Sequence, residues 1–221
     1  MNPSTSAGPR PHAWKLYSYV VVYDTGFAPN PFYGYCTLAC CKPAIRRSAN
    51  IGDGVVGLTP KSSGSRVAYY MRIDEIVESF DSYWRDRRFA RKKPRHDGRL
   101  VLKCGDNIYK PLTGGEYRQL PSMHSDGDKE DLERKEHDLG GKRILVSETF
   151  AYFGNEPVGL PPELNRLIVG RAHKCRFTGG EKAHFIAFVR DTGLEGVRSA
   201  PRSWFKDDDS WARAEAASRR C

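Results

Sequence analysis

Hydrophobic and polar positions divide the chain into short strand-like segments separated by polar turns. The segment KLYSYVVVYDTG, residues 15–26, is dense in β-branched and aromatic side chains on both of its alternating faces, which predicts a buried strand. The same criterion predicts four further strands: GVVGL at 54–58, RVAYYMRIDEI at 66–76, KRILVSETFAYFG at 142–154 and AHFIAFVRDT at 183–192. The sequence therefore predicts a sheet of four or five strands.

Helical patterns are fewer and shorter than the strand patterns. One helix is expected from about Cys41 to Ala49, with Pro43 in its first turn, and a second over 78–86, whereas 165–175 fits a short helix or a strand. The polar segment 59–65 is expected to be a hairpin loop. Together these elements predict an α+β fold with a strongly bent sheet or a small barrel, short flanking helices and long loops.

The chain ends and one internal segment differ in composition from the rest. Residues 1–13 contain almost nothing apolar and are expected to be a disordered leader, and residues 207–221 resemble a capped C-terminal helix. Between them, residues 14–206 are expected to form a single domain. Residues 121–141 are so charged and so poor in apolar side chains that they predict a long exposed insertion in that domain.

The charge balance favours a polyanionic partner. Lys and Arg number 36 against 27 Asp and Glu, a formal net charge of +9, and the basic segment at 85–99 would attract phosphate if it lay on one face. That segment fits a solvated linker equally well. The chain has neither a membrane-length apolar run nor a signal-peptide pattern, so we expect a soluble, cytoplasmic protein with free thiols.

Three of the six cysteines, at positions 36, 40 and 41, stand within GYCTLACCKPAIRR and allow three interpretations. The C-x3-C-C spacing differs from the C-x2-C of zinc knuckles, and a zinc site would need further ligands such as His173 and Cys175. A cysteine at a helix start beside Lys42 and Arg46 would be a reactive nucleophile, with Cys40 and Cys41 as the candidates. The commonest role of such residues is packing of a helix on a sheet. No metal or cofactor is assigned.

Polar residues after the first predicted strand could contact a ligand. Asp24 is a candidate general base, Thr25 and Asn30 are candidate ligand contacts, and an amide such as Asn30 can pair with the edge of a base. Lys42 and Arg46 are candidate phosphate contacts. The aromatic candidates for stacking on a base are Phe32, Tyr69 and Tyr109.

A second polar group comes from GDNIYKP and MHSD. It contributes Asp106, Asn107 and Ser125 as candidate ligand contacts and His124 as an acid or base that titrates near neutral pH. The chain carries no Walker loop, dinucleotide-binding glycine run, H-E-x-x-H motif or zinc-deaminase signature. These motifs alone therefore name no reaction.

Two resemblances sharpen the expectation. The order strand, helix, IGDGVVGL, strand resembles the PUA-like folds, including the EVE, ASCH and YTH domains, which implies a pocket for a modified base turned out of its stack. Four sequence segments resemble the nucleotide modification associated domain 2 family of bacteria and phages. They are YDTGFAPNPFYGYCTLACCKPAIRRSANIGDGVVGLTPK, GDNIYKP, MHSD and LVSETFAYFG. That resemblance implies a role in making or handling modified bases.

The expected function is therefore binding of nucleic acid, with DNA favoured, or of a nucleotide, through a base pocket beside the early helix. The alternative is a nucleotide- or base-modifying enzyme that uses Cys40 or Cys41 as nucleophile, or Asp24 with His124 as base and acid. A third possibility is a regulatory protein with a basic surface and no base pocket. The oligomeric state is left open.

Overall fold

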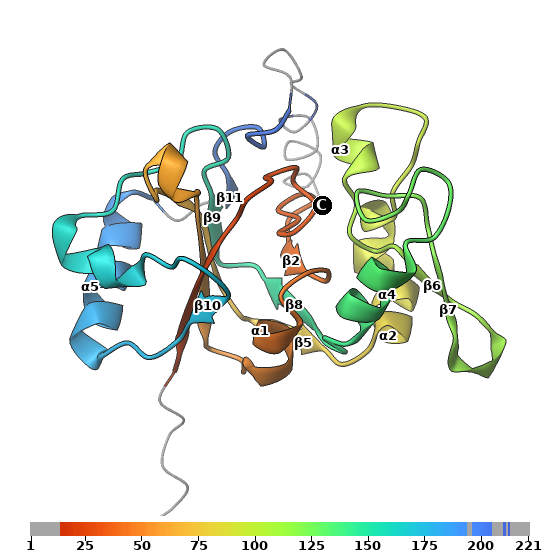
Figure 1. Cartoon of the computed structure of the whole chain (residues 1–221), viewed down its shortest axis with the longest axis horizontal. Helices are drawn as coiled ribbons and strands as arrows, with labels where there is room; N and C mark the ends of the chain where they lie inside the picture. The colour runs from red at the N-terminus through yellow and green to blue at the C-terminus, as the bar shows by residue number, and fades with distance from the viewer. Residues whose placement is uncertain (1–13, 194–195, 205–209, 211, 213–221) are drawn as a thin grey trace, which may run out of the picture.

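A computed structural model describes residues 14–193, 196–204, 210 and 212. Its largest element is an open mixed sheet with the strand order β10-β1-β3-β4-β9-β11 (Figure 1). The six strands are β1 (Leu16–Val20), β3 (Gly54–Leu58), β4 (Val67–Arg72), β9 (Phe150–Tyr152), β10 (His173–Lys174) and β11 (Gly196–Val197). The fold is α+β as predicted, but the large sheet stays open and forms no closed barrel.

The sheet combines parallel and antiparallel pairs. Strands β1 and β3 are parallel, with Leu16 opposite Gly54, whereas β3 and β4 form an antiparallel pair with a bulge at Gly57/Leu58. The predicted hairpin loop at 59–65 joins β3 to β4 and contains a 3-10 turn, Lys61–Ser63. The parallel β1–β3 pair requires a crossover, and that crossover carries the cysteine-rich segment.

Two smaller sheets lie beside the large one. One has the order β2-β8-β5, made of β2 (Cys36–Leu38), β5 (Glu75–Val77) and β8 (Ile144–Ser147), and the other pairs β6 (Tyr109–Pro111) with β7 (Tyr117–Gln119). The segments 66–76 and 142–154, each predicted as one strand, are therefore both divided between two sheets. Asp74 fixes the second break, because its Oδ2 accepts the backbone N–H groups of Glu148 and Thr149.

The helices are short. They are α1 (Pro43–Ser48), α2 (Phe80–Arg85), α3 (Leu100–Lys103), α4 (Leu132–Leu139) and α5 (Gly179–Asp191), with 3-10 turns at Arg87–Lys92, Thr113–Gly115 and Pro162–Leu167. The predicted helices at 41–49 and 78–86 are present as α1 and α2. None of the helices in the described part of the chain is long and apolar enough to cross a bilayer.

The predicted strand at 183–192 is wrong, because this segment lies within helix α5. Thr178 and Glu181 form a capping box that starts the helix. The two buried residues of α5, Phe185 and Val189, are four positions apart and so share one helical face. Residues four positions apart also lie on one face of a strand, so the alternation of side chains in this segment predicted a strand.

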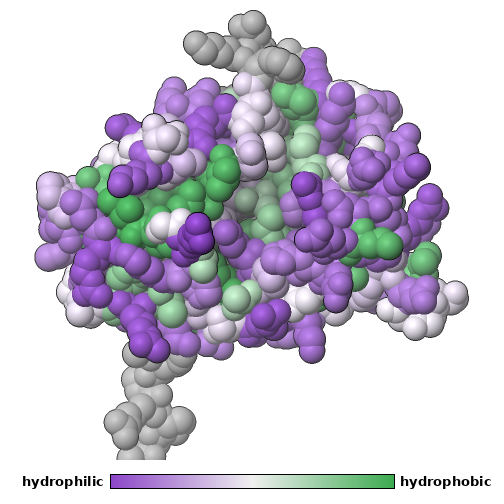
Figure 2. Space-filling view, in the orientation of Figure 1, coloured by the Kyte–Doolittle hydropathy of each residue, from purple (hydrophilic) through white to green (hydrophobic). Residues whose placement is uncertain are grey.

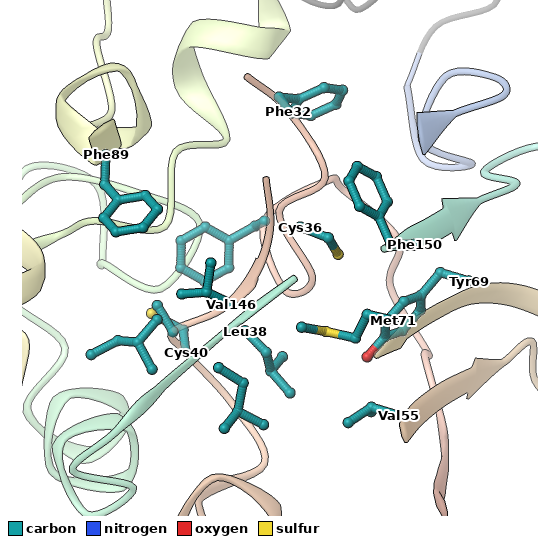
Figure 3. Packing of buried hydrophobic residues seen from close by; sticks show 14 of the residues in the cluster. Phe32, Cys36, Leu38, Cys40, Val55, Tyr69, Met71, Phe89, Val146 and Phe150 are labelled. Atoms are coloured by element: carbon teal, nitrogen blue, oxygen red, sulfur yellow. The ribbon is translucent and has the colours of Figure 1, made fainter. Parts of the chain in front are cut away.

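Two hydrophobic clusters hold the layers together. One contains Val55 and Met71 of the large sheet with Leu38 and Val146 of the β2-β8-β5 sheet, as Figure 3 shows. The other joins Val56 and its neighbours to Phe185 and Val189 of α5. Helix α5 thus covers one face of the large sheet, and the β2-β8-β5 sheet covers the other (Figure 1).

The leader at 1–13 and nearly all of the predicted C-terminal helix lie outside the described residues. Most of 121–141 is exposed or half-exposed, yet Asp138 at the end of α4 is fully buried. This buried carboxylate belongs to the site described next.

Candidate functional site

A tight turn between β2 and α1 presents Cys41 and Lys42. Both residues have left-handed backbone conformations, with φ of 59° and 44°. Such conformations cost a non-glycine residue of the order of 1 kcal/mol and persist where the surroundings impose them. Arg46 supplies part of that constraint, since its Nε donates to the Cys41 carbonyl at 2.8 Å and its Nη1 to the Arg143 carbonyl at 2.9 Å.

Cys41, His124 and Asp138 form a continuous chain of contacts. The Cys41 Sγ lies 3.4 Å from His124 Nε2, and His124 Nδ1 lies 2.7 Å from Asp138 Oδ2. The other Asp138 oxygen, Oδ1, accepts the backbone N–H of Cys41 at 2.6 Å. The hydroxyl of Tyr109 donates to Oδ2 at 2.9 Å. The buried carboxylate therefore orients both the thiol-bearing turn and the imidazole.

The electrostatics of this chain favour a charged histidine. Burial alone would lower the pKa of His124, but its hydrogen bonds to Asp138 and Cys41 outweigh burial and raise the pKa to about 9. Burial alone would raise the pKa of Asp138, but the bond from His124 outweighs it and the pKa is lowered. At neutral pH the carboxylate is thus ionised and the imidazole carries its proton beside the sulfur.

Cys41 and His124 face a pocket of about 440 Å³. Its walls come from the end of β1 and the loop after it, from the α1 turn, and from the 121–141 segment. The lining residues are Tyr19, Val20, Val21, Val22, Tyr23, Thr25, Phe27, Ala28, Cys41, Lys42, Met123, His124, Arg134 and Ser203. Besides the protonated His124 they include two cations, Lys42 and Arg134, and no carboxylate. In Figure 2 the face turned to the viewer is hollowed near its middle, and hydrophobic residues appear in the hollow.

Four of the candidate residues named from the sequence meet in this pocket: Thr25, Cys41, Lys42 and His124. Lys42 Nζ lies over the ring of Tyr19, 4.6 Å from its centroid. The ring of Phe27 lies 4.6 Å from that of His124 and fixes the position of the imidazole from its other side. Tyr109 joins the site indirectly, through Asp138.

Cys40 and Asp24, the other candidates for chemistry, are buried and are not among the residues that line the pocket. Cys40 is fully buried in the core (Figure 3), where burial raises the pKa of its thiol and its Sγ lies 3.6 Å from the carbonyl of Asp106. Asp24 accepts the hydroxyl of Tyr152 and the backbone N–H of Arg202, and burial raises the pKa of its carboxyl. Neither side chain lines the pocket.

The remaining predicted ligand contacts are used inside the protein. The amide of Asn30 donates to the Gly26 and Cys104 carbonyls at 3.0 and 2.9 Å, and that of Asn107 to the Tyr83 carbonyl at 3.0 Å. Others have the same internal character: Phe32 and Tyr69 are core residues (Figure 3), Asp106 is fully buried, and Ser125 closes its own loop by donating to Ser122 and Gly127 carbonyls.

The two predicted phosphate contacts, Lys42 and Arg46, have different surroundings. The guanidinium of Arg46 is fully buried, with its donors directed at the carbonyls of Cys41, Asp138 and Arg143, so it braces the turn. Lys42 reaches the pocket. Helix α1 itself has only six residues, Pro43–Ser48.

Half of the eight basic side chains in the segment 85–99 are paired with carboxylates or buried. Arg85 pairs with Asp81, Arg95 with Asp97, and Arg88 with both Glu75 and Asp86. Lys92 is fully buried and donates to the carbonyls of Asn30 and Tyr35. The segment therefore offers fewer free charges to phosphate than its composition predicts.

Sequence reasoning missed Asp138 and ten of the fourteen residues that line the pocket, among them Tyr19, Tyr23, Phe27, Met123 and Arg134. Asp138 stands in a run of charges on α4, where nothing local distinguishes it from its neighbours. The one signal was that MHSD, already noted for His124, precedes a segment with a helix cap at Asp131. A helix there implies that part of the supposed insertion packs on the domain.

Within the described residues, one group of side chains is close enough to share a metal ion. Cys40, His124 and Asp138 bring one ligand atom each within 4.8 Å of one another. His173 and Cys175, considered above as zinc ligands, are outside this group. Both nitrogens of His124 and both oxygens of Asp138 already have hydrogen-bonding partners.

The fold and the site define an α+β domain with a cysteine, a histidine and an aspartate aligned at one pocket. A family comparison supplies the identity: the nucleotide modification associated domain 2 family matches residues 13–208, and the chain belongs to this family. Neither the curated proteins nor the solved structures contain a significant match. The likeness to PUA-like folds accordingly stays a prediction.

Proposed function

We propose that this protein is a thiol-dependent enzyme of a nucleotide-modification system, with Cys41 as nucleophile and His124 as acid and base. The observation that carries the proposal is the alignment of Cys41 Sγ, His124 and Asp138 at 3.4 and 2.7 Å, with Cys41 and His124 on the pocket wall. A nucleophile, a base within hydrogen-bond reach and a third group that orients the base form the general pattern of covalent catalysis. The family context supports a nucleotide or its base as the substrate.

The arrangement supports attack on a carbonyl or amidine carbon, and nucleobases contain both. With the thiol proton of Cys41 held on His124 Nε2, the sulfur attacks as the thiolate and forms a bond to that carbon, and the π electron pair moves to the attached oxygen or nitrogen. When the pair returns, the leaving group departs with the proton from His124 Nε2. Water then attacks the carbon, gives its proton to His124, and displaces the sulfur. Asp138 holds the imidazole in place throughout.

Alkylation tests the nucleophile directly. Iodoacetamide is expected to modify Cys41 ahead of Cys175, the other half-exposed cysteine among the described residues, with the sites read by peptide mass spectrometry. His124→Gln is expected to slow the reaction of Cys41 at least about 10-fold, because the positive neighbour is lost. The matched control is His137→Gln, an exposed histidine next to Asp138, which should leave the rate unchanged.

Product analysis tests the reaction. Nucleosides from cells that produce the wild-type chain are compared with those from cells that produce Cys41→Ala or Cys175→Ser. A mass-shifted nucleoside should require Cys41 and survive the Cys175 change. If Cys41 reacts no faster than Cys175, or if purified protein contains one tightly bound zinc per chain, the proposed chemistry is wrong.

The second candidate is a binding module without chemistry, which was the leading expectation from the sequence. Its supporting observation is the aromatic and apolar lining of the pocket, with Tyr19, Tyr23 and Phe27 available to contact a base. If cells that produce Cys41→Ala still contain the mass-shifted nucleoside, and the variant binds the nucleotide as the wild type does, a binding function is favoured over the enzyme.

A further inference from the structure

The pocket that contains Cys41 has an unusual rim. Six large hydrophobic side chains are exposed within the described part of the chain, and three of them line this pocket. They are Val22, Tyr23 and Met123, with exposed fractions of 57%, 82% and 38%. Exposed apolar groups that gather at one opening mark a binding surface.

The rim extends outward beyond the reacting groups. Tyr19 and Phe27 are buried in the pocket wall, whereas Tyr23 is largely exposed at the exit from β1. One base held against Cys41 and His124 would occupy the inner part of the pocket. The exposed ring of Tyr23 then remains for a second flat group that lies outside.

The charges around the opening have one sign. Lys42 and Arg134 line the pocket, and no Asp or Glu is among its lining residues. Arg134 is partly engaged, since its Nη1 donates to the Met123 carbonyl at 3.1 Å and its Nε lies 3.3 Å from Asp131. These contacts position the guanidinium at the rim while more than half of the side chain stays exposed. A polyanion with flat apolar groups complements this surface.

We infer that the substrate is a base within a single strand of nucleic acid, with the neighbouring base stacked on Tyr23 and the backbone phosphates near Lys42 and Arg134. This inference rests on the proposed function for the identity of the base in the pocket. Aromatic stacking and cationic contacts are the general means by which proteins hold single strands. A free nucleotide would leave the outer aromatic and apolar rim without a partner.

The test uses the full chain carrying Cys41→Ala, so that binding is separated from chemistry. The probe is a fluorescein-labelled, mixed-sequence single-stranded DNA of about 12 nucleotides, read by fluorescence anisotropy, with an RNA of the same length as a second arm. Tyr23→Ala in this background is expected to weaken binding about 10-fold. Leu112→Ala, an exposed hydrophobic change outside the pocket, is the matched control and should have no effect.

Salt and competition complete the test. Arg134→Gln should reduce the slope of log affinity against log salt by about one, as expected for one lost phosphate contact. A deoxynucleoside monophosphate should compete at least about 100-fold less well than the unlabelled strand. Equal competition by the mononucleotide, or unchanged binding by Tyr23→Ala, would overturn the inference.

The outcomes separate this inference from the proposed function. If the strand binds with the expected dependence on Tyr23 but Cys41 proves unreactive toward iodoacetamide, the strand surface stands and the enzyme proposal falls. If Cys41 is reactive but mononucleotides bind as well as strands, the enzyme proposal stands and the strand surface falls. The RNA arm shows which polymer is preferred.

Discussion

Asp138 and Asp106 are both fully buried, and both accept a tyrosine hydroxyl, yet they do different things. Tyr109 donates to Asp138 at 2.9 Å, and Tyr83 donates to Asp106 at 2.7 Å. The Asp106 carboxyl has Thr37 as its second side-chain donor, at 2.7 Å, whereas Asp138 has His124. One carboxylate is thus bound by neutral hydroxyls and the other by a titratable ring.

The difference appears in the pKa values. Burial raises the pKa of Asp106, and the hydroxyl bonds and the nearby Lys92 only reduce that rise. At Asp138 the histidine reverses the effect of burial and lowers the pKa. A buried carboxylate is therefore informative about function when its partner can exchange a proton and that partner faces a pocket. His124 meets both conditions, and the partners of Asp106 meet neither.

The largest contrast is expected between Asp138→Asn and Asp106→Asn. Loss of the Asp138 charge should destabilise the fold by about 3 kcal/mol, because the histidine is left without its buried partner. It should also reduce the alkylation rate of Cys41 at least about 10-fold. Asp106→Asn should cost about 1 to 3 kcal/mol and leave the rate unchanged. Urea denaturation and peptide mass spectrometry measure the two effects.

The comparison breaks if Asp106→Asn slows Cys41 as much as Asp138→Asn does. Asp128→Asn, a change at an exposed carboxylate in the same 121–141 segment, is the control for a general effect of charge. It should alter neither stability nor rate.

The next effect is on pH dependence. The folded pKa of His124, about 9, lies above its ordinary 6.5, so its contribution to stability is complete below about 6.5 and is lost as pH rises through about 9. The stability difference between wild type and His124→Gln should be about 3 kcal/mol near pH 6 and should vanish near pH 10. Because the Asp138 pKa is lowered, its contribution is present above its ordinary 3.8 and is lost as pH falls further. A difference that grows with rising pH would contradict the His124–Asp138 pair.

Strands β1, β3 and β4 and helix α1 could be predicted because their own side chains favour one conformation. Val55, Val56 and Leu58 belong to a short apolar run with β-branched residues, which favours a buried strand, and within a helix Pro43 fits only the first turn. The strand prediction for the α5 segment was wrong because Phe185 and Val189 fit both the alternating pattern of a strand and the spacing of a helix. The capping box decided between the two patterns, and it lies before the apolar run.

Only part of the site could be predicted, because its residues come from distant parts of the sequence. Cys41 and Lys42 are adjacent in sequence, and their chemistry is visible from residue type alone. The contact with His124 spans 83 positions, and that with Asp138 spans 97, so no local pattern relates them. Asp106, Asn107 and Asn30 appeared equally suited to bind a ligand. Only the three-dimensional structure shows that their polar atoms are hydrogen-bonded to backbone groups and hydroxyls inside the core.

The smallest effect distinguishes the two tyrosines. Tyr109→Phe removes one donor from the Asp138 carboxylate, and Tyr83→Phe removes one from Asp106. Each change should cost about 1 kcal/mol of stability, since each deletes one buried hydrogen bond. Only Tyr109→Phe should change the alkylation rate of Cys41, by a factor of about 2 to 5, because the carboxylate that orients His124 is less firmly held. The same variant should raise the pKa of Asp138, measured by NMR titration, since a hydrogen bond to the ionised form is lost. Equal rates for the two variants would mean that Tyr109, like Tyr83, serves the core alone.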